Sequence, residues 1–170
     1  MKTQTFTIGM ILILLLSLSV SAEHVTKEEA AVVGKNYYWE NCSKAQTLGY
    51  DQVELTWFAT ESLEGMPVYH VFNVNSNNGF IIVSADDNVR PVMGYSGTGS
   101  WTGDNIPHAL QQLLGVYRNQ VAETITESIE GGKAIDEMWD WYRKSTPQAP
   151  ESKAVSPLLT TTWDQGIYYN

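Results

Sequence analysis

The spacing of apolar residues changes twice along the chain, and this change restricts the fold more than any other feature of the sequence. Over residues 26–41 apolar side chains recur every three or four positions, as they do on one face of a helix. Four short apolar or alternating segments follow, separated by clusters of Gly, Asn and Asp that are typical of turns. These predicted strands lie at about residues 53–57, 68–74, 80–84 and 91–95. Helical spacing then returns and continues to about residue 143.

This order of patterns predicts one domain of the α+β class, a twisted antiparallel sheet of about four strands with packed helices. In the first strand Val53, Leu55 and Trp57 alternate with polar residues, so these three side chains are expected to face the core. The long helix after the strands is expected to end at the glycine pair 131–132. A shorter helix is expected over residues 135–143.

The first 22 residues have the features of a secretory signal peptide. Lys2 supplies a positive charge, an apolar stretch follows, and small residues precede a predicted cleavage site after Ala22. The apolar stretch is shorter than the roughly 20 residues that span a bilayer, so no stable membrane anchor is expected. The mature chain is therefore expected to be secreted, in the periplasm or outside a bacterial cell.

The acidic composition limits the partners of the chain. It has 19 acidic and 10 basic side chains, which gives a formal net charge of −9. Phosphate groups and anionic lipids would be repelled, so no nucleic acid partner is expected. A single cysteine excludes an intramolecular disulfide, and three separated histidines give a metal cluster few ligands. No metal and no cofactor are therefore expected.

The side chains that most often act in catalysis do not suggest an active site. Cys42 is the only thiol and lies near the end of the first helix, where a structural role is more frequent than a nucleophilic one. His70 lies within an apolar strand, which favours a structural histidine, and His108 is expected at the surface. Asp86 and Asp87 are adjacent in a predicted turn, where carboxylates usually bond to local backbone. Taken alone, these residues indicate a secreted binding or scaffold domain.

Three segments of the strand region carry a family resemblance. They read Tyr-His-Val-Phe-Asn-Val at residues 69–74, Gly-Phe-Ile-Ile-Val-Ser-Ala-Asp-Asp at residues 79–87 and Pro-Val-Met-Gly-Tyr-Ser at residues 91–96. They resemble the prodomain of streptopain-type cysteine peptidases of the papain-like clan, a domain that also occurs as stand-alone, Spi-like inhibitors. In residues 157–170 the groups Pro-Leu-Leu, Trp-Asp-Gln and Tyr-Asn resemble the first residues of the mature enzyme. The resemblance covers about residues 25–170.

The resemblance implies a domain organisation and a function. It implies an inhibitory prodomain over residues 23–144, a linker with the processing site over residues 145–156, and the truncated start of a peptidase domain over residues 157–170. The prodomain would cover the active-site cleft of a papain-like cysteine peptidase domain, in cis or in trans, until it is cleaved off. The family's catalytic cysteine and histidine motifs are absent here, so residues 1–170 are expected to be inactive alone.

The resemblance also selects candidate site residues. Gln165 matches the glutamine of the family's oxyanion hole and would act only if the peptidase domain follows. Lys153 is a candidate processing site, and an ordinary solvated lysine is an equal alternative. Two surface segments, residues 73–79 and 96–104, are candidates for insertion into the cleft, and an ordinary hairpin connection is the alternative for both. The favoured first segment contains the candidate inhibitory residues Asn73, Asn75, Asn77 and Asn78.

Three functions stay open at this stage. The leading hypothesis is the inhibitory propeptide portion of a secreted streptopain-like cysteine peptidase zymogen. The second is a stand-alone secreted inhibitor of such a peptidase, in which Gln165 would have no oxyanion role. The third is a secreted binding module without a peptidase partner. Inhibition of a streptopain-like enzyme by the purified domain would separate the third hypothesis from the first two.

Overall fold

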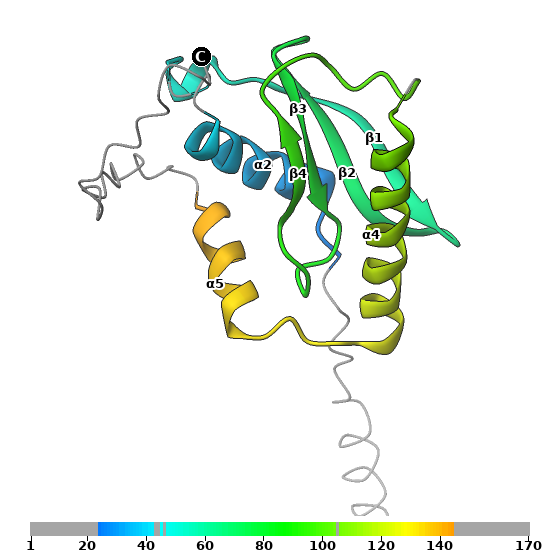
Figure 1. The fold of residues 1–170 in the computed structure, drawn as a ribbon. Coiled ribbons are helices and arrows are strands. Elements are labelled where there is room, and N and C mark those ends of the chain that lie inside the picture. The colour runs from blue at the N-terminus through cyan, green and yellow to red at the C-terminus, as the bar shows by residue number, and fades with distance from the viewer. Residues whose placement is uncertain (1–23, 43–44, 46, 105, 145–170) are drawn as a thin grey trace, which may run out of the picture.

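The computed structural model describes residues 24–42, 45, 47–104 and 106–144. An antiparallel sheet forms the middle of the domain (Figure 1), with its strands in the order β1 (Leu55–Leu63), β2 (Met66–Val74), β3 (Gly79–Ser84) and β4 (Val92–Ser96). One side of the sheet carries the helices α2 (Lys27–Asn41) and α5 (Lys133–Tyr142), and the other side carries α4 (His108–Glu127). A 3-10 turn, η1 (Tyr50–Gln52), precedes β1. The predicted α+β class is confirmed, with a four-stranded antiparallel sheet and packed helices.

Each face of the sheet has its own hydrophobic core. On the α2 side Phe72 and Ile81 pack in one buried cluster with Val33 of α2. On the α4 side Val71 and Ile82 pack in a second cluster that also contains helix residues of α4. Because helices cover both faces, β2 and β3 are apolar at nearly every position, which explains the continuous apolar runs in the sequence.

The first helix begins and ends as its sequence predicts. Thr26 is the N-cap, and its Oγ1 accepts a hydrogen bond of 3.2 Å from the backbone N–H of Glu29. The helix ends at Asn41, and Cys42 follows as a buried cap residue with 6% of its surface exposed. Cys42 therefore has the position expected of a structural residue.

Strand β1 differs from its prediction. It covers Leu55–Leu63 instead of residues 53–57, and an irregularity in its pairing with β2 falls between Trp57 and Ala59. Val53 is buried but lies before the strand, and 49% of the Trp57 side chain is exposed. The prediction that Trp57 faces the core is wrong, because β1 is an edge strand and the helices cover its outer part less completely than they cover β2 and β3.

Helix α4 ends earlier than the glycine pair 131–132. Its last residue is Glu127, and Ser128 closes it in the left-handed conformation, with φ of 51°. Ile129 therefore leaves the helical stripe and is 49% exposed. Gly131 instead packs so closely on the β3–β4 turn that a Cβ at this position would lie 2.5 Å from the carbonyl oxygen of Asn88.

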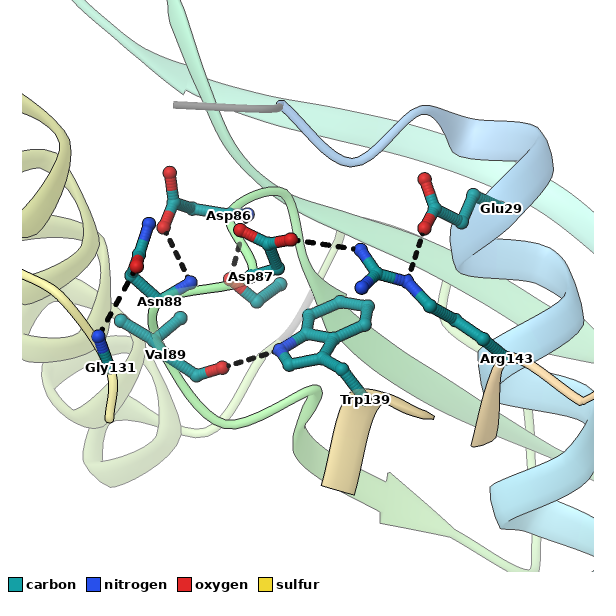
Figure 2. A network of polar contacts seen from close by, with 9 residues as sticks. Glu29, Asp86, Asp87, Asn88, Val89, Gly131, Trp139 and Arg143 are labelled. Atoms are coloured by element: carbon teal, nitrogen blue, oxygen red, sulfur yellow. Dashed lines mark hydrogen bonds and ion pairs between the residues drawn. The ribbon is translucent and has the colours of Figure 1, made fainter. Parts of the chain in front are cut away.

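A polar network fixes α5 against α2 and the β3–β4 turn (Figure 2). Trp139 is 1% exposed, and its Nε1 donates to the carbonyl oxygen of Val89 at 2.8 Å. Arg143 donates to the carboxylates of Glu29 in α2 and Asp87 in the turn. The short helix predicted for residues 135–143 is confirmed, and it is an integral part of the fold.

Candidate inhibitory surface

The two candidate inhibitory segments lie next to each other at one end of the sheet. The β2–β3 loop and the segment after β4 both lie at the end where α4 begins, the upper end in Figure 1. An isolated parallel bridge between Asn78 and Gly99 joins them. The two segments, which the sequence analysis names as separate candidates for insertion into the cleft, therefore lie side by side in one surface.

Two of the four candidate asparagines hold this surface together. The Asn73 carboxamide bonds twice to the backbone of Trp101, accepting from its N–H at 2.6 Å and donating to its carbonyl oxygen at 3.0 Å. The Asn75 carboxamide accepts from the N–H of Glu54 at 2.7 Å and donates to the carbonyl oxygen of Gln52 at 2.9 Å. Each side chain thereby ties one neighbouring segment to the base of the loop.

The backbone of the loop is fixed in an uncommon conformation. Asn75 and Ser76 have φ values of 43° and 65°, in the left-handed region that few side chains favour. Gly79 has φ of 143°, and a Cβ there would lie 2.0 Å from the carbonyl oxygen of Ser96. The hydroxyl of Tyr38 in α2 donates to the carbonyl oxygen of Asn78 at 2.8 Å. Neighbouring elements thus determine the shape of the loop.

The tip of the loop presents uncharged polar groups to solvent. Ser76, Asn77 and Asn78 are exposed, and their side chains make no hydrogen bond with any residue that the structure describes. An amide side chain can both donate and accept, so Asn77 and Asn78 are equipped to bind the polar groups of a partner. The tip consists of one hydroxyl and two carboxamides and has no ionisable side chain, so its side chains are suited to hydrogen bonding with a partner.

His70 has the structural role that its strand position predicted. Its Nε2 lies 2.9 Å from the carbonyl oxygen of Val25, which can only accept, so this nitrogen carries the proton. Its Nδ1 accepts from the hydroxyl of Thr60 at 2.8 Å, and burial lowers the pKa of the ring. Both ring nitrogens are occupied, and His108 is exposed at the start of α4.

The remaining catalytic candidates do not come together either. Asp86 is buried and its Oδ1 accepts from the N–H of Asn88 at 2.9 Å, as expected for a turn, while Oδ2 has no partner among the described residues. Asp87 binds Arg143. No cluster of three or more metal-ligating side chains occurs within residues 24–42, 45, 47–104 and 106–144.

Several predicted features lie outside the described residues. They are the signal peptide with its cleavage site after Ala22, the linker with Lys153, and the C-terminal segment with Gln165. Among the helices that the structure describes, none has both the length and the apolar character needed to cross a bilayer.

Comparison with known families decides what kind of domain this is. The family profile described as Spi protease inhibitor matches residues 22–121, more than half of the chain. The chain belongs to the Spi protease inhibitor family. The matched residues include all four strands and most of α4, so the candidate inhibitory surface lies within the family domain.

A longer protein that is similar to this chain has the name of an enzyme. The chain is 28% identical, over 182 aligned residues, to a protein of Porphyromonas gingivalis named thiol protease/hemagglutinin PrtT. The match covers the whole of this chain but only 19% of that relative. No solved structure was found to match the chain.

Proposed function

We propose that this chain is the inhibitory propeptide portion of a secreted thiol protease precursor and blocks the active-site cleft until it is cleaved off. One observation carries the proposal: a chain of the Spi protease inhibitor family matches, over its whole length, a fifth of a protein named as a thiol protease. An inhibitor domain joined to its own target enzyme acts at a very high effective concentration, which suits a propeptide.

The loop after β2 is the part that we propose enters the cleft. Asn77 and Asn78 would contact the protease directly, and Asn73 and Asn75 would hold the loop in shape. A loop that is already ordered loses little conformational entropy on binding, which favours affinity. The left-handed backbone at Asn75 and Ser76 prevents the loop from lying extended across the cleft, so no peptide bond would be placed for cleavage.

The proposal includes the domain organisation and the type of protease. Residues 1–22 would be the signal peptide, cleaved after Ala22, residues 23–144 the inhibitory domain, and residues 145–156 the linker, cleaved near Lys153. Residues 157–170 would begin a papain-like peptidase domain of the streptopain type, in which Gln165 serves the oxyanion hole. The family match begins at residue 22, which supports a boundary between the apolar N-terminal segment and the domain.

A stand-alone inhibitor that acts in trans is the second candidate. The family match supports this second candidate, because the Spi protease inhibitor profile matches residues 22–121 and does not include the C-terminal segment. In both cases the partner is a papain-like cysteine peptidase domain outside the cytoplasm, and the same surface would bind it.

The test is inhibition of a mature thiol protease by the purified chain, with cleavage of a fluorogenic peptide as the readout. We expect inhibition by the wild type and a rise of the inhibition constant by about tenfold or more in the double variant Asn77→Ala, Asn78→Ala. Asn119→Ala, a substitution on the exposed face of α4, is the matched control and should leave the constant unchanged. A folded wild-type chain that inhibits none of several such enzymes would be a binding module instead.

A further inference from the structure

A groove of about 360 Å³ lies between β1 and the first half of α4, outside the inhibitory loop. Its walls contain apolar side chains, among them Phe58 and Trp101. They also contain the polar side chains of Glu61, Tyr69 and Arg118. Gly115 of α4 forms part of the wall without a side chain. The groove is therefore amphipathic, with apolar walls around a small set of charged and hydrogen-bonding groups.

Arg118 has unused binding capacity in this groove. Between His108 and Ala122, Arg118 is the only Asp, Glu, Lys or Arg residue of α4. No other side chain of these four types on this part of the helix therefore acts on a ligand in the groove. The Nη1 of Arg118 lies 3.4 Å from Oε1 of Glu61, while its buried Nε has no partner among the described residues. The guanidinium carries five N–H donors, and its side chain is 39% exposed, so donors not used by Glu61 remain for a ligand in the groove. These donors favour a ligand with a carboxylate group.

Tyr69 adds a second donor next to Arg118. Its hydroxyl takes part in no hydrogen bond with the residues that the structure describes. Burial, with a smaller contribution from Glu61, raises the pKa of Tyr69 to about 12, so the hydroxyl keeps its proton at neutral pH. A carboxylate that reaches Arg118 would find this O–H available as a donor.

The open side of the groove adjoins an unpaired sheet edge. Strand β1 is the first in the sheet order, so no described strand pairs with its outer side. Its sequence contains neither Lys nor Pro, the residues that commonly protect such edges. Trp57 and Phe58 are 49% and 38% exposed on this strand. An unpaired edge with exposed aromatic residues suits the binding of an extended polypeptide segment.

The groove is also continuous with the surface proposed to inhibit the protease. Trp101, which lines the groove, has its backbone bonded to Asn73 at the base of the inhibitory loop. The segment that contains Trp101 also carries Gly99, which forms the bridge to Asn78. Residues 99–101 thus connect the loop to the groove, so a partner seated on the loop would lie next to the groove.

We infer that this groove binds an extended segment of the protease domain, with an Asp or Glu side chain of that segment paired to Arg118. The inference rests on the proposed function and adds a second contact to it, outside the cleft. The loop would block the active site, while the groove would select proteases that present a carboxylate at the matching position. Proteases without this carboxylate would bind more weakly, because Arg118 would keep only its pairing with Glu61 and its remaining donors would lose water without gaining a partner.

The test uses a substitution that fills the groove without disturbing the fold. A Cβ on Gly115 meets no atom within 4 Å, and methionine favours a helix more than glycine does, so Gly115→Met should fold normally. The matched control is Ala109→Met, which adds the same side chain to an exposed position of α4 outside the groove. Arg118→Met removes the guanidinium and keeps the apolar stem.

The dissociation constant for a catalytically inactive thiol protease should be measured beside the inhibition constant for the active one. We expect both groove variants to raise the dissociation constant by about tenfold or more and Ala109→Met to leave it unchanged. An unchanged constant in Gly115→Met would overturn the inference while leaving the proposed function intact. Binding of the wild type without inhibition would refute the proposed function alone, and absence of any binding would refute both.

Discussion

His70 links the stability of the fold to pH through a chain of hydrogen bonds. The indole N–H of Trp57 donates to the Thr60 hydroxyl at 3.3 Å, that hydroxyl donates to His70 Nδ1, and His70 Nε2 donates to the carbonyl oxygen of Val25. This arrangement fits the neutral ring. A second ring proton would have to be added in a buried place, which explains why burial lowers the pKa of His70.

The sign of the pH dependence follows from this lowered pKa. Below the ordinary value of 6.5 the unfolded chain takes up a proton at His70 before the folded chain does. We therefore expect the contribution of His70 to stability to be complete above pH 6.5 and to decrease as the pH falls below it. Urea unfolding at several pH values measures this. His70→Gln should weaken the dependence, and equal slopes in wild type and His70→Gln would overturn this expectation.

The roles of the four candidate asparagines show what a sequence can and cannot reveal about single residues. The Asn and Gly content of the segment after β2 is enough to predict a loop. The engagement of Asn73 with Trp101, 28 positions away, depends on how β4 and its following segment return to the loop. Asn75 likewise bonds to backbone 21 and 23 positions earlier in the chain. Such contacts form only in the folded chain, so residue patterns alone do not separate supporting from exposed asparagines.

Elements buried on both faces were the easiest to predict. Strands β2 and β3 have helices on either side, and their apolar runs identify them directly. Strand β1 lies at the edge and contains irregular pairing near Phe58, so its alternation of polar and apolar residues changes partway along the strand. The end of α4 was missed for another reason, since Ser128 adopts the left-handed conformation that glycine usually supplies.

Trp139 is the one fully buried residue of the short helix α5. Trp139 is buried in the α2-side core, whereas Trp141, two residues later, is 39% exposed. We expect Trp139→Ala to lower the free energy of unfolding by about 3–5 kcal/mol, because it leaves a cavity and an unpaired carbonyl oxygen at Val89. Trp141→Ala should cost about 1 kcal/mol or less. Equal losses in urea unfolding of the two variants would show that α5 is not anchored as described.

At the scale of the whole molecule, the two ends of the sheet differ in their contacts. The end with the β3–β4 turn is closed by the contacts of Arg143, Trp139 and Gly131, and it holds α5 in place (Figure 2). The opposite end carries the β2–β3 loop with its exposed amides. The family match stops at residue 121, before α5, although the α2-side core includes Trp139. The α2-side core of this chain therefore extends beyond the matched residues, at least to Trp139.

In the proposed function, one end of this domain occupies the cleft of a thiol protease. The most direct measurement is steady-state inhibition of such a protease by the purified 170-residue chain at several substrate concentrations. We expect competitive inhibition, and a higher dissociation constant of the complex once a covalent thiol reagent fills the active site. Inhibition that is independent of substrate concentration, or a dissociation constant that is unchanged with the cleft filled, would rule out occupation of the cleft.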